Sequence, residues 1–176
     1  LSGGFTEHNL WCDYIYLDTD ERRRFAQVSH EYLIEQVQEQ SLAASGTTFD
    51  LNFNHPVKEL VWVGAANTTP ALDSASLTAP AALTTTYQLK LNGHDRFATR
   101  NARYFSRTQI WEHHTGSGGL ASTSAAATGG GFNDAINVYS FALKPEEHQP
   151  SGTCNFSRID NAQLVSNNVL TNAHIY

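Results

Sequence analysis

Short runs in which apolar and polar residues alternate recur along this 176-residue chain, and they limit its fold more than any other feature. Residues 47–53 place their aromatic and aliphatic side chains on one side of an extended chain, which predicts a half-buried strand. Residues 87–91 alternate in the same way, and Asn92-Gly93 directly after them predicts a tight hairpin. Strands are also predicted at residues 11–17, 30–38, 57–63, 94–97, 103–111, 136–143 and 156–165. Over 30–38 both faces carry apolar groups, so that a helix is also compatible with the pattern.

One short helix is predicted after Asp18, which is a preferred N-cap residue. Glu21 stands three residues later, as in a capping box, and Asp20 and Glu21 place negative charge in the first turn. The helix is expected to run through Arg22-Arg23-Arg24 to about Gln27.

Two long segments interrupt the strands. Residues 65–82 are small and polar with two prolines, and residues 115–131 consist almost entirely of Gly, Ser, Ala and Thr. Both are predicted to be surface loops, because they carry too little apolar surface to pack. About eight short strands, one short helix and no strand–helix alternation predict an all-β protein. The expected fold is a jelly-roll β-sandwich of about eight antiparallel strands with long loops.

Composition excludes several classes of protein. Apolar residues make up 40% and charged residues 16% of the chain, which is enough apolar material for a core. The net charge of −6 argues against contact with a nucleic-acid backbone, which calls for clustered cations. The one basic cluster, Arg22-Arg23-Arg24, is flanked by Asp20 and Glu21.

The sequence shows no pattern typical of an active site. Eight histidines invite a search for a metal site, but none form a His-x-His pair, and the side chains of His113 and His114 would point to opposite faces of a strand. Structural or solvent-facing histidines are predicted instead, with no metal and no cofactor. The acidic group at 18–21 is explained by helix capping, and Glu146-Glu147 by an exposed turn. We therefore predict a protein that is not an enzyme.

Two long stretches resemble a known family. Residues 13–27, which continue into 29–36, and residues 136–162 (INVYSFALKPEEHQPSGTCNFSRIDNA) are similar to the major capsid protein of nucleocytoplasmic large DNA viruses, the group that includes iridoviruses and algal viruses. Shorter similarities lie at 60–62, 92–97, 104–105 and 113–115. The two loop segments depart from the family.

The resemblance implies a structural role in an icosahedral virus capsid. The family's chain has a further, N-terminal jelly roll and continues past the equivalent of Tyr176, so residues 1–176 are expected to form the second jelly roll, lacking its last strand and truncated at both ends. The implied partners are two further copies in a trimeric, pseudo-hexagonal capsomer, neighbouring capsomers that tile the shell, and minor capsid proteins. No nucleic-acid contact is expected, and any link to the inner membrane of the virion would be indirect. The implied location is the virion, assembled inside the infected host cell.

Two segments, residues 18–27 and 144–158, are predicted to set subunit geometry. The alternative is that they lock the fold internally, with Arg22, Arg23 or Arg24 paired to Asp20, Glu21 or Glu146. The candidate residues for either role are Asp18, Asp20, Glu21, Arg22, Arg23, Arg24, Glu146, His148 and Arg158.

Two other functions stay open. A carbohydrate-binding, host-attachment jelly-roll module would use the loops at 65–82 and 115–131, although both are poor in the Trp, Tyr and charged residues typical of sugar sites. A cupin-type metalloenzyme would need a histidine cluster that the sequence does not display.

Overall fold

The computed structural model describes residues 9–42, 46–65, 85–120, 131–133 and 136–176. The chain divides into two compact units, one ending at Tyr32 and the other beginning at Leu33. The prediction that residues 1–176 make up one jelly roll, the second of a longer protein, stays a prediction. Most of the predicted loop at 65–82 and the middle of that at 115–131 lie outside the described residues.

The N-terminal unit contains one helix, α1, at Thr19–Gln27. The predicted capping box is confirmed: the Asp18 side chain accepts a hydrogen bond from the Thr19 amide at 2.7 Å, and Glu21 accepts from the Asp18 amide at 3.3 Å. The strand predicted at 11–17 is wrong, since this stretch pairs with no strand in the part of the chain that the structure describes. Alternation alone does not make a strand, because a ladder needs a partner.

The second unit is built from strands, and the predicted antiparallel β-sandwich is confirmed. Twelve strand segments lie in the described residues: β1 Gln40–Leu42, β2 Gly46–Asp50, β3 Pro56–Val57, β4 Glu59–Ala65, β5 Thr86–Leu91, β6 His94–Asp95, β7 Arg100–Asn101, β8 Ser117–Leu120, β9 Gly131–Asn133, β10 Ile136–Ser140, β11 Cys154–Asn155 and β12 Ala162–Ile175. The exception to antiparallel pairing is β8 with β9, which are parallel.

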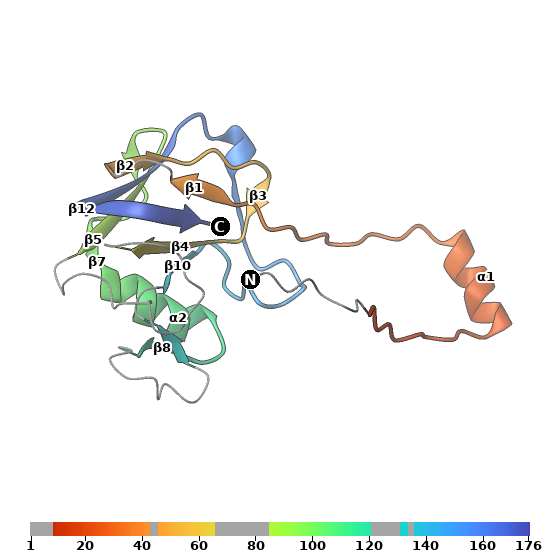
Figure 1. Cartoon of the computed structure of the whole chain (residues 1–176). Coiled ribbons are helices and arrows are strands. Elements are labelled where there is room, and N and C mark those ends of the chain that lie inside the picture. The colour runs from red at the N-terminus through yellow and green to blue at the C-terminus, as the bar shows by residue number, and fades with distance from the viewer. Residues whose placement is uncertain (1–8, 43–45, 66–84, 121–130, 134–135) are drawn as a thin grey trace. The chain divides into compact units, whose positions relative to one another are not determined.

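The long strand β12 belongs to both sheets of the sandwich. Residues 162–166 of β12 pair with β5, residues 163–165 and Leu170 pair with β2, and its last residues pair with β4 and β1 (Figure 1). One sheet therefore contains β10, β4, β12 and β1, and the other contains β2, β12, β5, β6 and β7. The strand predicted at 156–165 therefore begins and ends too early in the sequence. Residues Phe156–Arg158 form a 3₁₀ turn, and β12 starts at Ala162 and runs on to Ile175.

Residues 103–111 are helical, and the strand predicted there is wrong. They form a π-helical turn, η1 (Tyr104–Thr108), and a short α-helix, α2 (Gln109–His113). The buried residues are Phe105, Ser106, Gln109 and Ile110, a spacing that belongs to a helix rather than to a strand. No helix in the described ranges is long and apolar enough to cross a membrane.

The region 30–38, predicted as a strand, is extended but enters no ladder before β1 begins at Gln40. The run 47–53 keeps its predicted inner face, with Phe49, Leu51 and Phe53 at most 8% exposed, although β2 itself ends at Asp50. His55 at φ +69° explains the break before β3.

The predicted Asn92-Gly93 hairpin is confirmed between β5 and β6. Both residues have positive φ, +52° and +78°, as a type I′ turn requires. The Asn92 side chain also accepts hydrogen bonds from the amides of Asp160 and Asn161 at 2.9 and 3.1 Å, which fixes the hairpin tip to the turn before β12.

The core of the second unit is an aromatic cluster between the two sheets. The Phe105 side chain is fully buried, and its ring centroid lies 5.2 Å from that of Trp62 on β4, 5.8 Å from Tyr87 on β5 and 5.3 Å from Phe97. Trp62 and Tyr87 meet edge to face at 5.3 Å. Burial of Tyr87 is so complete that it raises the pKa of the phenol to about 12.

The predicted turn-rich connection after β10 is confirmed. It is closed by hydrogen bonds from the Leu143 amide to the Ser151 carbonyl at 3.2 Å and from the Lys144 amide to the Ser151 hydroxyl at 3.0 Å. Gly152 ends it at φ +133°, and a Cβ there would lie 2.9 Å from the Phe141 carbonyl oxygen. Only glycine fits this position.

We expect Phe105→Ala to lower the free energy of unfolding by about 3–5 kcal/mol, because the cavity would remove contacts with the rings of Trp62, Tyr87 and Phe97. The matched control is Trp111→Ala on α2, where the side chain is 75% exposed and the expected change is within about 0.5 kcal/mol. Denaturant titration followed by far-ultraviolet circular dichroism measures both. Equal losses would contradict the placement of these two residues.

We also expect Gly152→Ala to destabilise the protein more than Gly93→Ala. Both glycines have positive φ, but only Gly93, at +78°, is near the left-handed helical region, where alanine costs about 1–2 kcal/mol. At Gly93 nothing lies within 4 Å of the added Cβ, whereas at Gly152 it meets backbone. The difference between the two free energies of unfolding, measured by denaturant titration, reports the steric contact at Gly152 together with its more restricted backbone angle.

Candidate functional site

The predicted contact residues of the first segment lie on α1. Asp20 and Arg23 approach to 3.7 Å one turn apart, with side chains 88% and 67% exposed. Such an exposed pair contributes little to stability. No residue of α1 is buried, so Arg22, Arg23 and Arg24 are all exposed on this helix.

The predicted residues of the second segment are used in different ways. Glu146 accepts hydrogen bonds from the Thr115 hydroxyl at 2.7 Å and from the Thr115 amide at 3.2 Å, and it lies 3.0 Å from Nδ1 of His114. These contacts hold the pKa of Glu146 below its ordinary value, and the hydrogen bond from the Thr115 side chain has the largest effect. Glu146 therefore stabilises the subunit internally.

His148 and Arg158 are not held in this way. The His148 side chain is 92% exposed, and its Nδ1 lies 4.0 Å from Glu35. Arg158 is exposed at the end of the 3₁₀ turn after β11. These two residues stay candidates for contact with another molecule.

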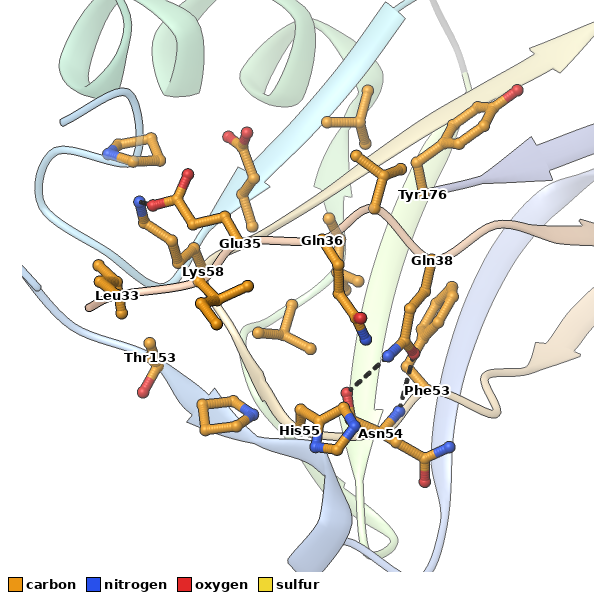
Figure 2. A pocket seen from close by; sticks show the side chains of 18 of the residues that line it. Leu33, Glu35, Gln36, Gln38, Phe53, Asn54, His55, Lys58, Thr153 and Tyr176 are labelled. Atoms are coloured by element: carbon orange, nitrogen blue, oxygen red, sulfur yellow. Dashed lines mark hydrogen bonds and ion pairs between the residues drawn. The ribbon is translucent and has the colours of Figure 1, made fainter. Parts of the chain in front are cut away.

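A groove of about 600 Å³ lies in the second unit beside residues 33–38 (Figure 2). Its other side is formed by residues 53–61, which include β3 and the start of β4. Lys58 pairs here with Glu35 and donates to the Glu147 carbonyl at 3.0 Å. The hydrogen bond from Lys58 lowers the pKa of Glu35. One lysine thus joins residues 33–38 to the connection after β10.

Two glutamine side chains act as a substitute for a neighbouring strand. The Gln38 amide group donates to the Asn54 carbonyl at 3.3 Å and accepts from the Asn54 amide at 3.0 Å (Figure 2). The Gln40 amide group donates to the Asp50 carbonyl at 2.7 Å and accepts from the Asn52 amide at 2.8 Å. The backbone of 50–54, which continues β2, is thereby satisfied by side chains along its edge.

Sequence reasoning did not find these contacts. The period-two spacing of Gln36, Gln38 and Gln40 was visible and shows that alternate side chains share a face. Nothing in the sequence indicates that Gln38 and Gln40 bind the backbone of residues 50–54, because only the folded structure brings the two segments together. The histidines 113 and 114 also lie at a helix end, and not on the strand that was expected.

No cluster of three His, Cys, Asp or Glu side chains that could hold a metal ion occurs within the described parts of the chain. The chemistry these contacts support is association and internal locking by hydrogen bonds and ion pairs.

We expect the double variant Gln38→Ala/Gln40→Ala to speed amide hydrogen exchange at Asn52 and Asn54, because both amides lose their acceptors. A loss of about 0.5–1.5 kcal/mol per hydrogen bond corresponds to about two- to tenfold faster exchange at each amide. Gln36→Ala, in the same segment, is the control and leaves both rates unchanged. Unchanged exchange in the double variant would show that the two side chains do not cover this edge.

Comparison with known proteins gives the family. The family model described as "Large eukaryotic DNA virus major capsid protein" matches residues 21–174. The major capsid protein of Pyramimonas orientalis virus is 52% identical over 88% of this chain, and that of Paramecium bursaria Chlorella virus 1 is 41% identical over 89%. The chain spans 40% of the length of each of these relatives.

A solved structure, the quasi-atomic model of the PBCV-1 virus capsid, superposes with a TM-score of 0.65 at 32% identity and covers 92% of this chain and 51% of that one. The similarity agrees with the two antiparallel sheets and confirms the predicted jelly-roll class. This chain therefore belongs to the large eukaryotic DNA virus major capsid protein family.

Proposed function

We propose that this chain is part of a major capsid protein and builds the icosahedral shell of a large DNA virus. The observation that carries the proposal is the family match across residues 21–174, joined to the structural similarity with a virus capsid over 92% of the chain. The role is structural, and its chemistry is the association of subunits in the virion.

We propose further that the chain is the second of two jelly rolls in each subunit and that three subunits form a pseudo-hexagonal capsomer. A closed symmetric assembly repeats one set of surface contacts, which suits a rigid sandwich with loops at its ends. Neighbouring capsomers and minor capsid proteins would be the further partners. The coverage of 40% of each relative supports a position within a longer subunit.

Within the subunit, α1 is the better candidate for a contact with another molecule. Its acidic and basic residues are exposed, and its geometry depends on its own capping box. Exposed arginines are frequent anchors in protein interfaces because the planar guanidinium group forms several hydrogen bonds at once.

The first test is the native mass of the longer protein of which we propose this chain is a part, by light scattering after size exclusion. A stable trimer is expected. A monomer at all concentrations would overturn the capsomer proposal and direct attention to the host-attachment alternative, for which a glycan array is the screen.

Arg23→Ala separates assembly from folding. We expect the free energy of unfolding to stay within about 0.5 kcal/mol of the wild type, because the side chain is exposed. The dissociation constant of the trimer should rise about tenfold or more, which is the loss typical of an interface arginine. Arg103→Ala, at an exposed arginine outside both segments, is the control. Normal trimers with a lower melting temperature would mean that the arginine locks the fold instead.

A further inference from the structure

His114 lies between two carboxylates that come from distant parts of the chain. Its Nε2 is 2.8 Å from Oε2 of Glu59, the first residue of β4. Its Nδ1 is 3.0 Å from Oε1 of Glu146, in the connection after β10. His114 itself directly follows α2, and its side chain is only 11% exposed. Three elements of the second unit therefore meet at one imidazole ring.

The geometry of these contacts favours one protonation state. A neutral imidazole carries a hydrogen on one nitrogen and a lone pair on the other. With a carboxylate oxygen close to each nitrogen, a neutral ring would direct its lone pair at a negative charge. The imidazolium ion instead carries the opposite charge: it presents an N–H to Glu146 at Nδ1 and forms an ion pair with Glu59 at Nε2.

We propose that His114 is a pH-sensitive latch: as an imidazolium ion it ties the connection at residues 143–152 to β4 and α2, and loss of its proton loosens that connection. The latch acts within one chain and does not depend on the proposed role in a capsid.

The residues on either side of His114 also contact the connection after β10 and limit its movement. Nδ1 of His113 lies 3.1 Å from the Leu143 carbonyl oxygen, and Thr115 donates to Glu146 through both its amide and its hydroxyl. The His113 contact does not need a charge on His114, whereas the Glu146 carboxylate is held jointly by Thr115 and His114. Deprotonation is therefore expected to loosen the connection at Glu146 without unfolding the unit.

The charged surroundings set the direction of the effect. The ionisable side chains on the helical turn, on α2, around the start of β4 and in the connection are Arg107, Glu112, His113, Lys58, Glu59, Lys144, Glu146, Glu147 and His148. Lys58 pairs with Glu35, and Lys144 lies 3.1 Å from Glu147. The two groups that act on the imidazole are Glu59 and Glu146, both negative.

These contacts raise the pKa of His114 above its ordinary value of 6.5, and Glu59 has the largest effect. Desolvation of the partly buried ring lowers the pKa, but by less than the two carboxylates raise it. Because the folded-state pKa is the higher one, the stabilisation is complete below 6.5 and is lost as pH rises through the raised pKa. The pKa of Glu146 is lowered from 4.5. The stabilisation that its carboxylate contributes is therefore lost as pH falls through that lowered pKa. The latch is thus closed in mildly acidic solution and opens toward alkaline pH.

The test follows amide hydrogen exchange at Thr115 and Glu147 by NMR between about pH 5 and pH 9, corrected for the intrinsic pH dependence of exchange. In the wild type, protection at both amides should fall as pH rises, by up to about tenfold for each unit by which the pKa of His114 exceeds 6.5. The ring of His114, observed in the same samples, should lose its proton above pH 6.5.

His114→Gln should remove this pH dependence and leave the two amides weakly protected throughout. His148→Gln, at an exposed histidine of the same connection, is the matched control and should keep the wild-type profile. Protection that does not vary with pH in the wild type, or a profile in His114→Gln equal to that of the wild type, would overturn the proposal.

Glu59→Gln keeps the test decisive if His114→Gln does not fold. It retains the imidazole and the shape of its neighbour but removes one negative charge. The loss of protection should then shift to lower pH. A transition at the wild-type pH in Glu59→Gln would show that the contact between His114 and Glu59 does not control the latch.

Discussion

The second unit depends on the pairing of β12 with four other strands. A backbone that enters a sheet must satisfy its amides and carbonyls along both edges, and β12 finds partners in β2 and β5 over its first half and in β4 and β1 over its last residues. Register shifts in these ladders fall between Val165 and Leu170 and between Thr171 and His174. Such irregularities let one strand leave one sheet and join the other. The sandwich is consequently held together by a continuous chain as well as by its core.

Where no strand is available, glutamine side chains complete the hydrogen bonding. Gln38 and Gln40 each donate to and accept from the backbone beyond β2. Gln109 has the same function on the other sheet: it accepts from the Ser140 amide of β10 at 3.0 Å and donates to the Tyr104 hydroxyl at 3.0 Å. Gln109 and Ser140 are buried, so an unpaired amide there would be costly. A primary amide suits this position because it carries a donor and an acceptor side by side.

The same features explain what the sequence could and could not predict. The capping box at Asp18 and the Asn92-Gly93 turn were predicted correctly because each depends on residues within four positions of one another. The strand predicted at 156–165 ended too soon, whereas β12 runs on to Ile175, because its buried face changes phase. Leu164, Ser166 and Leu170 point inward at even positions, whereas Ala173 and Ile175 point inward at odd ones. A shift of register moves the buried side chains from even to odd positions. A search for strict alternation therefore stops at the shift, although the strand continues.

The helix at η1 and α2 was missed for a different reason. Its aromatic and β-branched residues favour strands by intrinsic propensity, but the ring of Phe105 packs from a helical turn against Trp62 on β4 and Tyr87 on β5. Tertiary packing decided the local structure there, and no short-range signal could supply it. The overall class was nevertheless predictable, since it depended on several runs of alternation and not on any single one.

The two segments that family resemblance presented as equivalent differ in how they are held. In the second segment, Glu146 contacts Thr115 and His114 of the same chain, so replacing it is expected to disturb the connection after β10. In the first segment, the Asp18 and Glu21 side chains close the helix on itself, and the pair Asp20 and Arg23 is exposed. The start of α1 is capped by its own residues and does not depend on another element. The helix can therefore present the same side chains to any molecule that it contacts. The second segment is therefore tied into the second unit, whereas the charged pair of the first segment is exposed, although both segments have a similar density of charge.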